Sequence, residues 1–162
     1  MLKTVVAISN RIDSVVKIFM QIGLLTIVLL VLLEVFLRNV VGQSLYWIEE
    51  VAVTYIGTWF VFIGASHAMK VGMLIRLEFL VERLSEKAAK MVFIVSQLGI
   101  LLFLMVLIVY GIRLTAMTLE QPSPALQMPV GIAYFGIVVG SGLMVLHTCA
   151  SMIRRFQGYQ GS

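Results

Sequence analysis

The chain has 162 residues, of which 60% are hydrophobic and 12% charged, and its formal net charge is +4. This composition is typical of a single membrane domain spanning residues 1–162 and excludes a separate soluble domain that could house chemistry of its own. The small positive charge gives no reason to expect nucleic acid as a partner, and one cysteine, Cys149, cannot form an internal disulfide.

Four apolar runs are each long enough to cross a bilayer. They are Ile18–Leu37, Val51–Met69, Met91–Ile112 and Pro129–Ile153. A helix needs about 20 mostly apolar residues to span a hydrocarbon core of about 30 Å. The sequence therefore predicts an all-α integral membrane fold with four transmembrane helices.

The segment before the first span has a weak amphipathic pattern. Apolar residues recur at helical spacing from Val5 to Val15, and Lys3, Arg11 and Lys17 could meet lipid headgroups. This segment is a candidate for an interfacial helix that runs into the first span.

Glu34 is the one carboxylate clearly inside an apolar run. Arg38 follows it at i+4, the spacing that brings two side chains together on one helix face. Because an unpaired charge at a helix centre costs about 2.5–3.5 kcal/mol or more, we predict a structural ion pair between Glu34 and Arg38. Two alternatives are a contact with a partner and proton coupling in a small self-sufficient exporter.

The second span opens with aromatic and acidic residues. Tyr46 and Trp47 suit an aromatic belt at the membrane surface, and Glu49 and Glu50 suit the positive end of a helix. Adjacent helical residues point about 100° apart, so we expect one glutamate to face water and the other to face protein.

Two histidines, His67 and His147, fall at similar depth near the ends of their spans. Facing histidines in a four-helix bundle could ligate a b-type haem, as in a membrane anchor subunit of a respiratory complex. Hydrogen-bonding histidines are the commoner outcome, so we expect no cofactor, metal ligand or catalytic residue on this chain, which would then not be an enzyme.

The connection between spans two and three is rich in both apolar and charged residues. In Arg76–Lys90 the apolar residues recur on one side of a helix. This pattern predicts an amphipathic helix in the cytoplasmic interface or against a partner, with a solvated linking helix as the alternative.

The connection between spans three and four contains all three prolines of the chain, within Gln121–Pro129. Proline forbids helix there and favours an extended course, and a stiff loop loses less entropy when a partner docks on it. In span four, Gly136 and Gly140 form a G-x-x-x-G step that permits close helix packing.

Lysine and arginine are concentrated before span one, between spans two and three, and after span four. Because basic residues in short loops stay on the cytoplasmic side, we predict that both termini are cytoplasmic. The short loops Arg38–Tyr46 and Arg113–Met128 would then lie outside.

The segment Arg38–Glu50, which reads RNVVGQSLYWIEE, resembles the signature between spans one and two in the small membrane subunit of TRAP (tripartite ATP-independent periplasmic) transporters. Further similar positions follow in order, namely Trp59, Gly64-Ala65, Gly72–Glu78, Ser123–Pro129 and Tyr134. The resemblance covers roughly Arg38 to Arg155. One departure is Leu74, which stands where the family often has histidine, so any role of that histidine is absent here.

The resemblance implies a bacterial inner-membrane subunit with two protein partners. In the family, a large elevator-type membrane subunit carries the substrate and sodium sites. A periplasmic binding protein delivers an organic anion such as a carboxylate or sugar acid. The small subunit would be a non-catalytic scaffold that binds neither substrate nor sodium, so its sequence does not name the substrate.

This interpretation gives two sets of candidate residues. The candidates for the interface with the large subunit are Arg38, Trp47, Glu50, Trp59, Gly136 and Gly140. The candidates for a periplasmic docking rim are Tyr46, Glu49, Ser123 and Pro124.

Overall fold

The computed structural model describes residues 2–42, 45–71 and 85–158 of the chain, and all of its regular elements are helices. These elements are α1 (Leu2–Phe36), the π-helix η1 (Leu37–Val41), α2 (Tyr46–Glu49), the π-helix η2 (Glu50–Gly57), α3 (Thr58–Val71), α5 (Glu86–Thr118) and α6 (Gly131–Gly158). Since α2, η2 and α3 follow one another without a break, they form a single rod.

Four helical segments are long and apolar enough to cross a membrane, which confirms the predicted spans. They are Ile8–Val41, Tyr46–Val71, Lys87–Thr118 and Gly131–Ile153. The first three extend beyond the apolar runs, because a helix continues until its backbone is interrupted and polar residues alone do not interrupt it.

The two segments expected at the interface have different outcomes. The N-terminal amphipathic segment is not a separate element, because α1 runs unbroken from Leu2 to Phe36. Of the predicted helix Arg76–Lys90, residues 76–84 lie outside the described part of the chain. Ser85 has an extended backbone and caps α5, so Glu86–Lys90 is the first part of the third span's helix.

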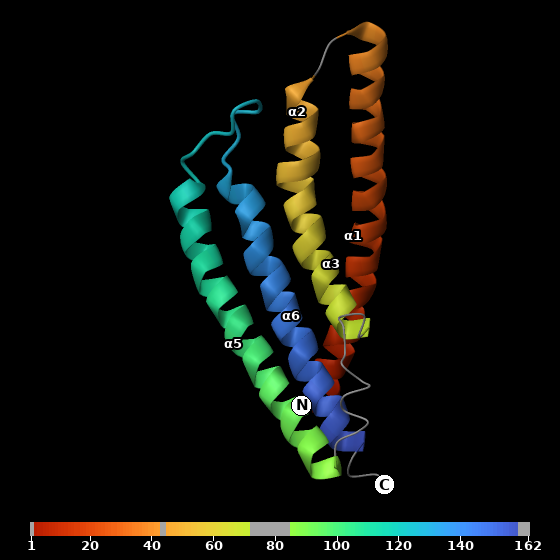
Figure 1. Cartoon of the computed structure of the whole chain (residues 1–162), viewed down its shortest axis with the longest axis vertical. Helices are drawn as coiled ribbons and strands as arrows, with labels where there is room; N and C mark the ends of the chain where they lie inside the picture. The colour runs from red at the N-terminus through yellow and green to blue at the C-terminus, as the bar shows by residue number, and fades with distance from the viewer. Residues whose placement is uncertain (1, 43–44, 72–84, 159–162) are drawn as a thin grey trace.

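The four rods lie in the spatial order α5, α6, α3, α1 (Figure 1). Rods that follow one another along the chain run in opposite directions, so the neighbours α3 and α6 run parallel, with Trp59 beside Ile132 at one end and Met69 beside Thr148 at the other. We call the end where α1 begins and α6 ends the terminal end, and the end that carries the connection between α5 and α6 the loop end. Helix α6 is central, because it packs on both α3 and α5 and also contacts α1. In its apolar window 39% of residues are buried, against 11% in α1 and 6% in α5.

Close packing of α6 on α3 depends on the G-x-x-x-G step. A Cβ atom at Gly136 would lie 3.0 Å from Cγ of Trp59, and one at Gly140 would lie 2.5 Å from Cβ of Phe62 and 2.6 Å from its carbonyl carbon. Only glycine permits this approach. Gly136, Gly140 and Trp59, which we expected at a partner interface, therefore pack against each other's helices within the chain.

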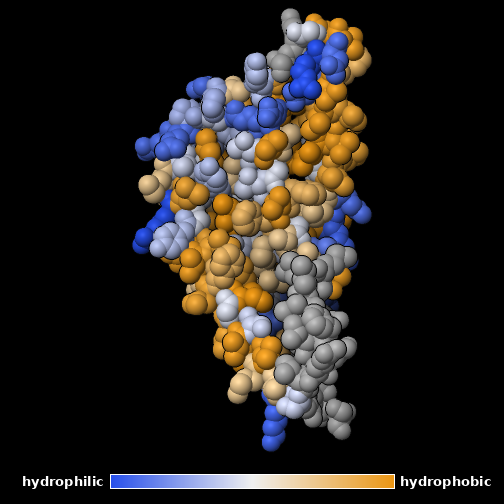
Figure 2. Space-filling view, viewed as in Figure 1, coloured by the Kyte–Doolittle hydropathy of each residue, from blue (hydrophilic) through white to orange (hydrophobic). Residues whose placement is uncertain are grey.

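The outer faces of α1 and α5 are strongly apolar. Leu25 and Leu32 on α1, and Val95 and Leu102 on α5, are among many exposed large hydrophobic residues. Figure 2 shows hydrophobic residues along α1 and across the middle of one face, with many hydrophilic residues toward the loop end. These faces suit lipid or a membrane-embedded partner.

Candidate functional site

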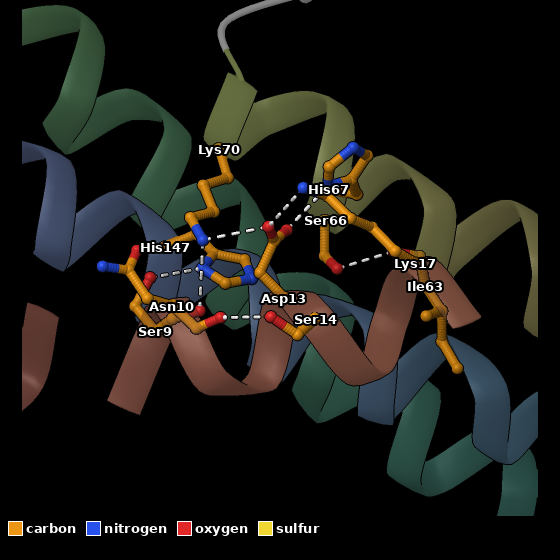
Figure 3. A network of polar contacts seen from close by, with 10 residues as sticks. All are labelled: Ser9, Asn10, Asp13, Ser14, Lys17, Ile63, Ser66, His67, Lys70 and His147. Carbon is orange, nitrogen blue, oxygen red and sulfur yellow. Dashed lines mark hydrogen bonds and ion pairs between the residues drawn. The ribbon is translucent and has the colours of Figure 1, made fainter. Parts of the chain in front are cut away.

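Polar side chains gather at both ends of the bundle. At the terminal end, six residues from three helices form what we call the polar cluster. Its members are Ser9, Asp13 and Lys17 of α1, His67 and Lys70 of α3, and His147 of α6 (Figure 3).

Asp13 is the centre of the polar cluster and is 5% exposed. Its Oδ1 lies 2.6 Å from Nδ1 of His67, and its Oδ2 lies 3.0 Å from Nζ of Lys70 and 3.6 Å from Nζ of Lys17. Because a carboxylate only accepts hydrogen bonds, Nδ1 of His67 carries the proton in this contact. Asp13 thus forms ion pairs with residues of both its own helix and α3.

Ser9 attaches α1 to α6, one turn away from Asp13. Its Oγ is 2.8 Å from Nδ1 of the buried His147, and its carbonyl oxygen accepts a hydrogen bond from Nζ of Lys70 at 3.4 Å. The polar cluster therefore joins the start of α1 to the ends of α3 and α6. The contact between Asp13 and Lys70 is between charged groups, and hydrogen bonds between charged groups are stronger than neutral ones.

Both histidines are hydrogen-bonded, the commoner of the two outcomes considered for them. His67 bonds to Asp13 and His147 to Ser9, each through Nδ1. The haem alternative rests only on the presence of two histidines at similar depth. Sequence reasoning missed Asp13, since its partners on α3 are far along the chain. The local signal was the placement of Ser9, Asp13 and Lys17 at successive i+4 positions on one helix face.

Glu34 is half-buried and Arg38 is exposed, and no ion pair between them occurs in the described part of the chain. The π-helix that begins at Leu37 forms i→i+5 hydrogen bonds and so changes the residue spacing around Arg38.

At the loop end, the segment between α5 and α6 is closed by its own hydrogen bonds. Pro122 and Pro129 form an antiparallel bridge, and the Ser123 N–H donates to the Met128 carbonyl at 2.9 Å. The Met128 N–H donates to Oγ of Ser123 at 3.3 Å, and Gln127 has a φ of 56°. The extended course predicted from the prolines is thus a closed, hairpin-like loop.

Three side chains of the second span bind this loop and the start of α6. Oε2 of Glu50 accepts a hydrogen bond from the Ala125 N–H at 2.8 Å. The Tyr55 hydroxyl donates to the Met128 carbonyl at 3.0 Å, and Nε1 of Trp59 donates to the Ile132 carbonyl at 2.9 Å. We call Glu50, Tyr55 and Trp59 the loop clamp.

The docking-rim candidates differ in exposure. Tyr46, Glu49 and Pro124 are exposed, whereas Ser123 is only 1% exposed because its backbone and hydroxyl close the loop. Ser123 is therefore a loop-closing residue that presents no side chain to a partner. Trp47 and Arg38 are exposed, so both side chains remain available to a partner protein.

Glu49 and Glu50 divide as the helical geometry predicted. Glu49 is exposed, while Glu50 is half-buried and bonded to the loop. The second oxygen of Glu50, Oε1, is enclosed and has no hydrogen-bond partner among the described residues. Glu50 therefore already serves a contact within its own chain.

Comparison with known proteins gives one family. The family model described as "Tripartite ATP-independent periplasmic transporters, DctQ component" matches residues 27–158. The match begins inside α1 and covers the π-helices, the loop clamp and all of α6. No curated protein matches the chain.

Proposed function

Because the chain belongs to the DctQ component family of tripartite ATP-independent periplasmic transporters, we propose that this inner-membrane subunit is the scaffold of a sodium-driven importer of organic anions. The membership makes it the small membrane subunit of such a transporter. The proposal adds that a large elevator-type subunit carries the sodium and substrate sites, and that a periplasmic binding protein delivers a carboxylate or sugar acid.

The observation that supports a scaffold best is where the polar and apolar groups lie. In the described residues the polar cluster and the loop clamp join helices at the two ends, while the flanks of α1 and α5 between them are apolar and exposed. A subunit that widens and steadies a larger one needs apolar flanks and firm helix contacts. A substrate path would need polar groups at mid-bilayer.

We further propose that the terminal end is cytoplasmic and the loop end periplasmic. The helix order places the start of α1 and the end of α6 at one end (Figure 1). Basic residues before span one and after span four favour the cytoplasm for that end. The loop clamp would then face the compartment of the binding protein.

Purification in mild detergent, followed by identification of co-purifying proteins, tests this function. We expect a large multi-span subunit to co-purify, and the reconstituted pair to import an organic anion only with a sodium gradient and the binding protein. A stable homodimer that transports alone would instead support the small proton-coupled exporter.

A further inference from the structure

We infer that the π-helix η2 sets the register of the second span so that Glu50, Tyr55 and Trp59 hold the periplasmic loop in one conformation, ready to dock the binding protein. Glu50, Tyr55 and Trp59 act as positioning residues. The surface that they hold in place is the loop tip at Pro124 and Ala125. The docking half rests on the proposed function.

The first step is the register of the second span. In an α-helix, residues five apart point about 140° away from each other. Glu50 and Tyr55 are five apart and lie within η2, whose i→i+5 hydrogen bonds widen the turn and bring such a pair closer to one face. Trp59 follows Tyr55 by four residues, from η2 into the first turn of α3, a spacing that keeps the two side chains on nearly the same face. Without the π-helix, Glu50 would turn away from the other two.

The second step is the choice of partners. All three side chains bond to backbone atoms, at Ala125, Met128 and Ile132, each 73 or 75 residues further along the chain. Bonds to the backbone fix the path of a segment and leave its side chains available. The Tyr55 and Glu50 bonds hold the loop itself, while the Trp59 bond, with the edge-on contact of Trp59 with Phe135, holds the first turns of α6.

The third step is the shape of the loop that is held. Its stem is closed by the bridge between Pro122 and Pro129 and by the buried Ser123. Its tip at Pro124 and Ala125 is exposed, and the Ala125 N–H is the group that Glu50 binds. The clamp thus acts on the part of the loop that a periplasmic partner would meet first.

The fourth step is the benefit of fixing that tip. Ordering a loop during association costs free energy, so a loop already fixed in its bound shape binds more tightly with no new contact. Loss of the clamp should therefore weaken docking of the binding protein and leave the transport step itself unchanged.

Hydrogen exchange of the assembled two-subunit transporter in lipid nanodiscs tests the positioning half, because it needs no binding protein. We expect Glu50→Ala to speed exchange at the Ala125 amide about tenfold, since a hydrogen bond to a charged acceptor is lost. Glu50→Gln keeps an acceptor and should restore most of the protection. Glu49→Ala, at the exposed neighbour, is the matched control and should leave exchange unchanged. Equal exchange in the Glu50→Ala and Glu49→Ala variants would overturn the clamp.

Transport tests the docking half. With Glu50→Ala or Tyr55→Phe, we expect the KM for the binding protein to rise several-fold. At saturating binding protein, kcat should be unchanged. Glu50→Gln, which keeps a hydrogen-bond acceptor, should have a KM close to that of the wild type. If exchange at the Ala125 amide becomes faster in Glu50→Ala while the KM for the binding protein stays constant, the binding protein does not dock on this loop. A wild-type complex that fails to assemble or to need a binding protein would instead overturn the proposed function, and the exchange result would stand independently.

Discussion

The carboxylate of Asp13 lies 2.6 Å from Nδ1 of His67, and through this contact and the neighbouring Lys70 the first helix is attached to α3. Neither residue is in a family-signature segment, and the family match begins at residue 27, beyond Asp13. Of the polar cluster, Ser9, Asp13 and Lys17 lie before the matched residues, whereas His67, Lys70 and His147 lie within them.

We expect Asp13→Ala to destabilise the bundle by about 3 kcal/mol, because removing one member of a buried ion pair leaves the other charge unmatched. Thermal unfolding of the purified subunit in mild detergent measures the change. Lys17→Ala is the control: its side chain is 56% exposed and its contact with Asp13 is the longest of the three, so it should change stability little. Equal losses in the two variants would contradict the central role of Asp13.

Gly140→Ala should destabilise the chain by about 1–3 kcal/mol, because the added methyl group meets the backbone of Phe62, which cannot move aside easily. Gly142 lies two residues away on α6, and nothing lies within 4 Å of a Cβ atom there. Gly142→Ala should therefore be neutral or slightly stabilising, as expected for alanine in a helix. The same thermal measurement compares the pair, and a neutral Gly140→Ala would show that α6 and α3 are not in close contact.

Glu34→Gln should leave uptake by the assembled transporter largely intact, because we propose that the ion sites are on the large subunit. Initial uptake rates in proteoliposomes, normalised to the amount of complex, measure this. Complete loss of transport with normal assembly would restore an ion-coupling role for Glu34.

The proposed orientation predicts opposite labelling of two exposed positions. In a Cys149→Ala background, Ala125→Cys should react with a membrane-impermeant maleimide in right-side-out vesicles, and Ser85→Cys should react only after the vesicles are opened. Both positions are exposed in the structure, whereas Ser123 is buried and unsuitable for labelling. The reverse pattern would invert the topology.

The spans could be predicted from the sequence because the length and hydropathy of a segment are local properties. The same is true of the division between Glu49 and Glu50, which follows from helical geometry. The polar cluster and the loop clamp could not be predicted in this way. Asp13 and His67 are 54 residues apart, and Glu50 and Ala125 are 75 apart.

The π-helices were missed for a different reason. Propensity and periodicity distinguish helix from strand, but they do not reveal a change from i→i+4 to i→i+5 hydrogen bonds within one apolar run. The sequence of η2, EVAVTYIG, reads as an ordinary start to a membrane helix. The alignment of Glu50 with Tyr55 could therefore be recognised only in three dimensions.

The span of the polar cluster along the chain also bears on how the protein is made. A chain is synthesised from its N-terminus, so Asp13 reaches the membrane before His67, and Ser9 precedes His147 by 138 residues. The newly inserted first helix therefore offers Asp13 only Lys17, on the same helix, until the second helix brings His67 and Lys70. The Ser9–His147 bond forms only once the fourth helix has inserted, which makes it a marker of completed biogenesis.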